Sequence, residues 1–239
     1  MKYIFLLSGD YIDLAKGEVL SLFKINNHKI IDKLLIVELD NEKQTKEISK
    51  RLALTKSIYK FLFKCKIDGL TQLMEKYDWN SVYKNNFCLR LNYVNDDNKN
   101  TIKDINNKKI IKKKNLSEKE LAFYIWTSLK NPKVDLENPK TKIELFFYKD
   151  NVYCGLLIND ITEDFESRKS HLRPFPHPSS LHPKLARALI NISGIKENET
   201  LLDPFCGTGG FLIEAGLMKI KIVGCDISKN MIEGCKENL

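Results

Sequence analysis

The chain has 239 residues, of which 43% are hydrophobic and 29% charged, and its formal net charge is +8 at pH 7. This composition is ordinary for a globular protein, and the length allows more than one core. No apolar run approaches the roughly 20 residues that span a bilayer, and the apolar core of the N-terminus is too short for a secretory signal, so we expect a cytoplasmic protein.

The positive charge is unevenly placed. Residues 1–170 hold 31 of the 39 Lys and Arg residues and 24 of the 31 Asp and Glu residues. An excess of this kind would steer a polyanion such as a nucleic acid toward the N-terminal part. A general lysine bias of the proteome explains the charge equally well.

The cysteines indicate neither a zinc site nor a disulfide framework, because they lie far apart and form no C-x-x-C pair. We expect reduced thiols that are mostly buried. The six are Cys65, Cys88, Cys154, Cys206, Cys225 and Cys235.

The first predicted unit covers residues 1–65. Its apolar segments predict strands over 3–9, 33–40 and 56–66, and helices lie between them. The first helix has one apolar face, formed by Ile12, Ala15, Val19 and Leu22. The order strand, helix, strand, helix, strand is typical of a ferredoxin-like α+β domain.

The second predicted unit covers residues 66–160. A helix over 70–77 and a strand over 87–94 precede a polar stretch rich in lysine. A capping box, Ser117 with Glu120, then opens a second helix, and a β-hairpin ends the unit. The apolar stripe of the second helix is expected at Ala122, Ile125, Trp126 and Leu129.

The lysines of the polar stretch are candidate phosphate contacts, although such runs also form solvated surfaces. They are Lys108, Lys109, Lys112, Lys113 and Lys114.

An extended linker is predicted over 161–180, because a cluster of prolines forbids a continuous helix. Arg168 and Arg173 in this linker are two further candidate RNA contacts. Three of the four histidines fall in or next to the linker, at positions 171, 177 and 182. No helix or hairpin fixes their relative geometry, so we expect no metal site.

The last predicted unit, residues 181–239, contains a glycine-rich turn between two short apolar strands. The strands, 200–203 and 221–226, each end in an acid. This βαβ pattern belongs to doubly wound sheets, in which ligands bind beyond the carboxyl ends of the strands. Asp226 can accept hydrogen bonds from both hydroxyls of a ribose.

Glycines at 207, 209 and 210 let the backbone come close to a ligand at the start of a helix. A nucleotide such as NAD fits this argument as well, although the G-x-G-x-x-G spacing is absent. The lack of a G-K-[ST] ending excludes a P-loop.

The motif "DPFCGTGG", followed by "GCD" after the next strand, resembles the cofactor loop of S-adenosylmethionine-dependent methyltransferases that modify exocyclic amines of nucleic-acid bases. Together with "VDLENPKTKIELFFYKDNVYCGLLI" and "RPFPHPSSLHPKLARALINIS", it resembles the archaeal tRNA guanine N2-methyltransferases that carry a THUMP domain and act on guanine 10. The resemblance covers most of the chain from residue 134 onward. Residues 1 to about 130 match in layout only.

The resemblance implies that residues 1–65 and a THUMP domain over 66–160 grip tRNA, while a Rossmann-like domain, begun within 181–239, binds S-adenosylmethionine. It implies that Asp203, Phe205, Gly207 and Gly209 surround the methionine part of the cofactor and that Asp226 holds its ribose. The segment 177–181 closes the site. The full set of implied cofactor residues is Asp203, Phe205, Cys206, Gly207, Thr208, Gly209, Asp226, Ile227, His177, Ser180 and Leu181.

One motif of the family is missing. An Asp or Asn followed by Pro-Pro and an aromatic residue orients the guanine amine, and no such tetrapeptide occurs in the sequence. We therefore place no catalytic residue in this chain and expect the N-terminal part of an enzyme, or one subunit of a split enzyme completed by a second chain. The alternative is a non-catalytic tRNA-binding adaptor with a vestigial cofactor half-site. A THUMP-containing sulfur-transfer enzyme is disfavoured, because it would need a P-loop-like signature or C-x-x-C.

Overall fold

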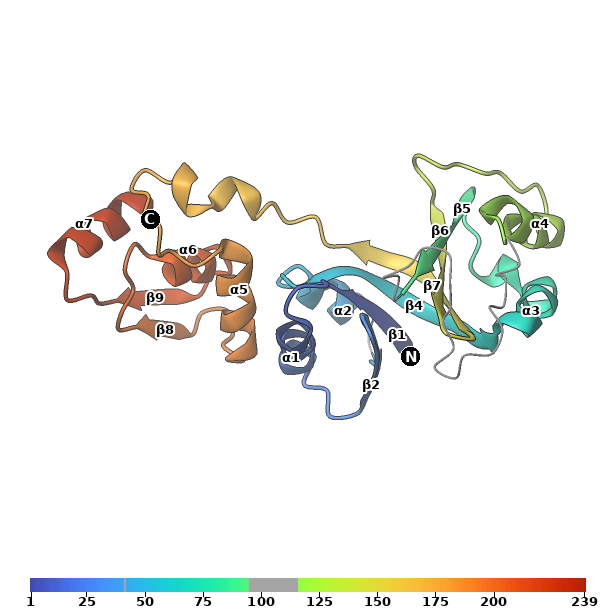
Figure 1. Cartoon of the computed structure of the whole chain (residues 1–239), viewed down its shortest axis with the longest axis horizontal. Helices are drawn as coiled ribbons and strands as arrows, with labels where there is room; N and C mark the ends of the chain where they lie inside the picture. The colour runs from blue at the N-terminus through green and yellow to red at the C-terminus, as the bar shows by residue number, and fades with distance from the viewer. Residues whose placement is uncertain (41, 95–115) are drawn as a thin grey trace, which may run out of the picture.

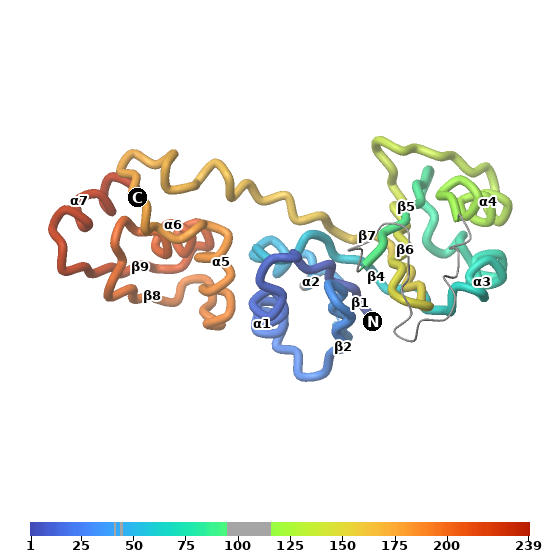
Figure 2. The backbone as a smooth tube through the Cα atoms, in the orientation of Figure 1, coloured from blue at the N-terminus to red at the C-terminus, as the bar shows by residue number. Residues whose placement is uncertain are grey.

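Two sheets organise the part of the chain that the structure describes (Figure 1). The computed structural model describes residues 1–40, 42–94 and 116–239. A seven-stranded sheet has the order β2-β3-β1-β4-β7-β6-β5, and a separate parallel pair is formed by β8 and β9. Figures 1 and 2 show an elongated molecule, with the small sheet and α5–α7 at one end and α3 and α4 at the other. Among the described residues, no helix is long and apolar enough to cross a membrane.

The large sheet is mixed, because β5 and β6 are parallel and the other neighbours are antiparallel. Its strands are β1 (Lys2–Leu7), β2 (His28–Ile31), β3 (Leu34–Glu38), β4 (Thr55–Lys66), β5 (Phe87–Tyr93), β6 (Thr141–Tyr148) and β7 (Asn151–Asp160). The hairpin of β6 and β7 confirms the prediction. Strand β2 was not predicted, because its four residues do not alternate between apolar and polar.

Strand β4 joins the two halves of the large sheet. Its first half pairs with β1, with Leu7 opposite Thr55, and its residues from Ser57 onward pair with β7, with Lys66 opposite Asn151. Backbone hydrogen bonding is therefore continuous across the boundary that we expected at residue 65.

Helices cover one face of the large sheet and close two apolar clusters against it. They are α1 (Ile12–Phe23), α2 (Glu42–Ser49), α3 (Leu70–Lys76) and α4 (Glu118–Ser128), with 3-10 turns at Ile67–Gly69 and Trp79–Ser81. The capping box of α4 is confirmed: Ser117 Oγ accepts from Glu120 N at 3.1 Å, and Glu120 Oε2 accepts from Ser117 N at 3.0 Å.

The apolar face of α4 differs in part from the prediction. Leu121, Ile125 and Leu129 are buried, which is a regular spacing of four residues. Trp126 was placed on this face and is 44% exposed, because it lies one position beyond the face that α4 turns toward the sheet.

The C-terminal part contains α5 (Pro183–Ile192), β8 (Thr200–Asp203), α6 (Gly210–Leu217), β9 (Lys221–Gly224) and α7 (Lys229–Asn238). Strands β8 and β9 are parallel, with Asp203 opposite Gly224. A segment with two short 3-10 turns, Glu166–Arg168 and Ser170–Leu172, leads from β7 to α5. The predicted βαβ unit is thus confirmed.

Helix α5 packs against α1 on one side and α6 on the other. In α5, Leu189 is exposed, whereas the polar residues Arg187 and Asn191 are buried. Two-sided packing explains why polar positions are buried, because it covers residues around most of the helix.

Candidate functional site

Two acids lie at the carboxyl ends of the parallel strands. Asp203 is the last residue of β8, and its Oδ1 accepts a hydrogen bond from Phe205 N at 3.1 Å. Asp226 follows β9; its Oδ2 accepts from Gly207 N and its Oδ1 from Ser228 N, both at 2.9 Å. Asp226 therefore fixes the glycine-rich loop from the neighbouring strand.

The loop between β8 and α6 is shaped by its own backbone. Cys206 N donates to Cys225 O and Gly209 N to Cys206 O, each at 2.8 Å. Gly207 and Gly209 have φ values of 52° and 84°, in the left-handed region that favours glycine. A Cβ on Gly209 would lie 2.7 Å from Cys235 Sγ, whereas one on Gly207 would meet nothing within 4 Å. The loop thus packs against α7 on one side and is open on the other.

The side chains of the loop divide into two kinds. Cys206 and Thr208 are buried, and burial raises the pKa of the Cys206 thiol to about 11. Phe205 and Ile227 are exposed, and they follow the ends of β8 and β9 by two and three residues. The buried pair supports the loop, and the exposed apolar pair is available to a ligand.

The linker meets the loop through Ser180, whose Oγ lies 2.8 Å from Thr208 Oγ1. Leu181 O lies 4.0 Å from the position of a Cβ on Gly210. The ring of His177 instead turns to Ser179, with 2.7 Å between Nδ1 and Oγ. The structure thus brings Ser180 and Leu181 to the loop, whereas the backbone of His177 bonds to Ser170 and Ser180 within the linker.

Asn238, which the sequence analysis missed, ties α7 to both segments. Its Nδ2 donates to Phe175 O at 3.0 Å and to Thr208 O at 3.1 Å, and its Oδ1 accepts from Phe175 N at 2.9 Å. No sequence pattern signalled these contacts, because they join residues 30 to 63 positions apart.

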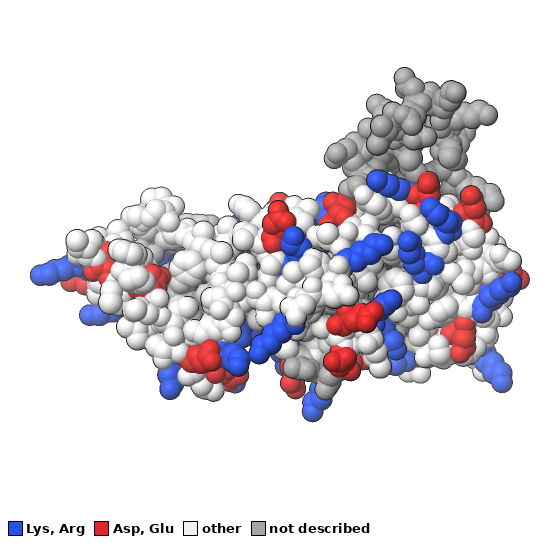
Figure 3. All heavy atoms as spheres, turned by 90° about the horizontal axis from the view of Figure 1, so that it is seen from below, with Lys and Arg blue, Asp and Glu red and all other residues white. Residues whose placement is uncertain are grey.

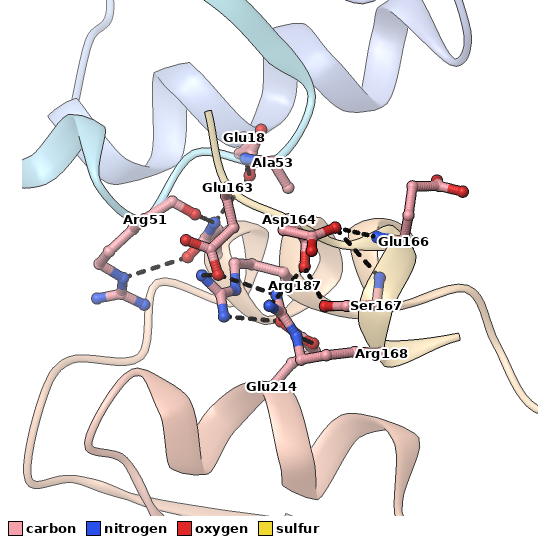
Figure 4. Close-up of polar contacts among 11 residues, drawn as sticks. Glu18, Arg51, Ala53, Glu163, Asp164, Glu166, Ser167, Arg168, Arg187 and Glu214 are labelled. Carbon is pink, nitrogen blue, oxygen red and sulfur yellow. Dashed lines mark hydrogen bonds and ion pairs between the residues drawn. The ribbon is translucent and has the colours of Figure 1, made fainter. Parts of the chain in front are cut away.

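An ion cluster joins the linker to α5 and α6 (Figure 4). Glu214 of α6 is fully buried and accepts from Arg168 Nε at 2.9 Å and Arg187 Nη2 at 2.7 Å. Glu163 approaches the same two arginines, at 3.0 and 3.5 Å. The charges of the two carboxylates and the two guanidinium groups therefore balance, and these ion pairs attach the linker to α6.

The candidate RNA contacts have different surroundings. Arg168 belongs to the ion cluster, and Arg173 is buried beside it. The lysines at 108, 109, 112, 113 and 114 lie outside the described residues. On the face shown in Figure 3, basic and acidic side chains of the described residues are interspersed and mark no single basic groove. RNA contact by these residues stays a prediction.

A second polar cluster joins the C-terminal part to the large sheet. Glu18 of α1 is fully buried and accepts from Ala53 N and Leu54 N, each at 2.8 Å. Asn191 of α5 donates to Glu18 Oε1 and to Arg51 O, also at 2.8 Å. Helix α5 is therefore bound to the N-terminal part through hydrogen bonds as well as apolar packing.

Among the described residues, no group of three or more His, Cys, Asp and Glu side chains is arranged to hold a metal ion. The C-terminal part matches the family model described as an RMKL-like methyltransferase domain, over residues 170–239. The strand-end acids and the glycine loop lie inside this match, so the class of this region is a methyltransferase domain.

Sequence relatives cover the whole chain. It is 34% identical to a tRNA (guanine(10)-N2)-dimethyltransferase of Methanothermobacter thermautotrophicus, over 100% of this chain and 68% of the relative. It is 30% identical to a protein of that name from Methanocaldococcus jannaschii, over 98% and 70%. The chain belongs to the tRNA (guanine(10)-N2)-dimethyltransferase family. TrmN from Thermus thermophilus shares the fold, with a TM-score of 0.56 at 14% identity over 100% of this chain and 69% of TrmN.

Proposed function

We propose that this chain contributes the tRNA-docking part and the first half of the cofactor site to an S-adenosylmethionine-dependent methyltransferase that acts on the N2 amine of guanine 10 in tRNA. The observation that carries the proposal is the pair of acids, Asp203 and Asp226, at adjacent strand ends on either side of the glycine loop. Family membership supports the choice of substrate.

The residues present fit a nucleoside cofactor. The loop is open at Gly207, where even an added Cβ would touch nothing within 4 Å. Asp203 and the loop backbone would hold the amino-acid part, and Asp226 would accept from the ribose hydroxyls. Phe205 and Ile227 would supply apolar contacts. The cofactor carries a methyl group on a sulfonium, and these residues orient it.

Residues 1–65, as a ferredoxin-like domain, and 66–160, as a THUMP domain, would hold the tRNA. The excess of basic over acidic residues in this part supports the assignment. The lysine-rich stretch and the described sheet would share the contact with the phosphate backbone.

The chemistry at the guanine amine needs groups that this sequence does not contain. An Asp or Asn before Pro-Pro and an aromatic residue would accept hydrogen bonds from the amine and stack on the flipped base. We propose that further polypeptide, such as a second chain, supplies them. The same absence supports a second candidate function, a non-catalytic tRNA-binding adaptor.

Transfer of labelled methyl groups to unmodified tRNA, measured with the chain alone and with lysate from its source, separates these functions. Activity that needs the lysate supports a completed enzyme. tRNA binding without activity in either sample supports the adaptor, and activity of the chain alone refutes the need for the missing motif.

The cofactor site is tested by Asp226→Ala. Loss of the hydrogen bonds to the ribose should weaken binding of S-adenosylhomocysteine by roughly 10- to 100-fold, as measured by calorimetry. Asp150→Ala, in the turn between β6 and β7, is the matched control and should leave the affinity unchanged. Full affinity in Asp226→Ala would refute the placement of the ribose.

A further inference from the structure

The guanidinium of Arg173 is buried, and its two terminal nitrogens lack a partner among the described residues. Arg173 is 9% exposed, and its Nε donates to Arg168 O at 2.9 Å. Its Nη1 and Nη2 are inaccessible to solvent, and no described residue accepts a hydrogen bond from them. Buried guanidinium nitrogens without acceptors are costly, so this arrangement calls for an acceptor that the described part of the chain does not supply.

The unpartnered nitrogens lie at the cofactor loop. A Cβ on Gly210, the first residue of α6, would be 3.7 Å from Arg173 Nη1 and 4.0 Å from Leu181 O. Two residues before Gly210, Thr208 bonds to Ser180 of the linker. The guanidinium therefore lies beside the N-terminus of α6, at the junction of the linker and the glycine loop.

The charges around Arg173 favour an anion as the missing acceptor. The carboxylates of Glu163 and Glu214 already balance Arg168 and Arg187. Arg173 is a third cation beside this neutral set. Burial lowers the pKa of Arg173, the charge of Arg168 adds to this, and only Glu214 opposes it. An anion at its Nη atoms would remove the imbalance.

We propose that Arg173 binds the carboxylate of the amino-acid part of S-adenosylmethionine. The two Nη donors match the two oxygens of a carboxylate, and the free N–H groups at the start of α6 favour the same charge. An RNA phosphate is a poorer fit, because the guanidinium is almost fully buried against the loop. This inference rests on the proposed function and replaces the prediction that Arg173 contacts RNA.

The test compares two nucleosides by calorimetry with the full 239-residue chain: S-adenosylhomocysteine and its decarboxylated analogue, which retains the amine. The wild type should bind S-adenosylhomocysteine roughly 10- to 100-fold more tightly than the decarboxylated analogue. Arg173→Met should abolish the preference, and Arg173→Lys should retain part of it. Lys169→Met is the matched control, because Lys169 pairs with Glu166 on the surface, and it should keep the full preference.

Each other outcome overturns the inference. A wild type that binds S-adenosylhomocysteine without preferring it, or an Arg173→Met variant that keeps the preference, refutes the role of Arg173 and leaves the proposed cofactor site standing. If Arg173→Met weakens the binding of both nucleosides equally, with an unchanged urea midpoint, Arg173 has a structural role. Weaker tRNA binding with an unchanged preference assigns Arg173 to a phosphate. A wild type that binds neither nucleoside refutes the cofactor site together with this inference.

Discussion

Glu18 is a carboxylate on an otherwise apolar face of α1. Burial raises its pKa above the ordinary value of 4.5, and hydrogen bonds from Leu54, Asn191 and Ala53 oppose the shift. Between the unfolded and folded pKa values, the folded chain binds more protons than the unfolded chain. The stability that this group contributes is therefore complete below about pH 4.5 and is lost as the pH rises through the folded pKa.

Glu18→Gln removes this titration. The free energy of unfolding of the wild type, minus that of Glu18→Gln, should fall as the pH rises above about 4.5. Urea denaturation between pH 4 and 8 measures the difference. Glu47→Gln, on the exposed face of α2, is the control. A difference that grows with pH would show that the hydrogen bonds outweigh burial and that the folded pKa is lowered.

The cysteines should differ sharply in reactivity. Cys206 is buried with a pKa of about 11, and burial also raises the pKa of Cys235, so both remain neutral thiols near pH 7.5. Cys225 is exposed. Iodoacetamide should therefore modify Cys225 first in the native protein, and peptide mass spectrometry identifies the site. Early modification of Cys206 would show that the loop opens in solution.

At the scale of elements, α7 packs closely against the linker, and this contact fixes its position. A Cβ on Gly234 would lie 2.2 Å from Phe175 Cδ1, so an alanine there must displace α7 or the ring. Gly234→Ala should lower the free energy of unfolding by about 1–3 kcal/mol, as for other overpacked sites. Urea denaturation measures the loss.

Gly216→Ala is the matched control, because Gly216 lies in α6 and an added Cβ would meet nothing within 4 Å. Its stability should be unchanged or up to about 1 kcal/mol higher, since alanine favours a helix. Equal effects of the two substitutions would show that the contact with Phe175 is not decisive.

Local sequence patterns predict most of the helices and strands. The capping box of α4, the hairpin of β6 and β7 and the βαβ unit of the C-terminal part follow from spacing and turn residues within a few positions. The placement of polar groups in the core does not follow from such local spacing. Glu18, Asn191, Arg187 and Glu214 are buried and have polar partners more than 20 residues away, and a periodicity of 3.6 residues cannot reveal such partners. For the same reason, no local pattern separates Arg173 from exposed basic residues.

At the scale of the whole molecule, α5 connects the two parts. Ala188 of α5 belongs to the same apolar cluster as Phe5, Ala15 and Val19 of the N-terminal part. The hydrogen bonds of Asn191 to Glu18 and Arg51 lie at the edge of this cluster. The parts therefore share a core instead of meeting only through a flexible linker.

Asn191→Ala should weaken the attachment of α5 to the N-terminal part. The buried Glu18 Oε1 and the partly buried Arg51 O lose a donor, which should lower the free energy of unfolding by about 1–3 kcal/mol. Hydrogen exchange should rise in α5 and at the amides of Ala53 and Leu54, whose acceptor is then less firmly held. Asn138→Ala, at an exposed position, is the control. Unchanged hydrogen exchange in α5 would show that apolar packing alone attaches α5 to the N-terminal part.

The shared core has a consequence for synthesis on the ribosome. Glu18 and Asn191 are separated by 173 positions, so α1 and the large sheet emerge long before the helix that covers them. Until then, the side of α1 that meets α5, at Gly17 and Glu18, stays open to solvent or to chaperones. Such contacts between distant segments form late and slow folding. The first core to be synthesised is therefore completed only when α5 has left the exit tunnel.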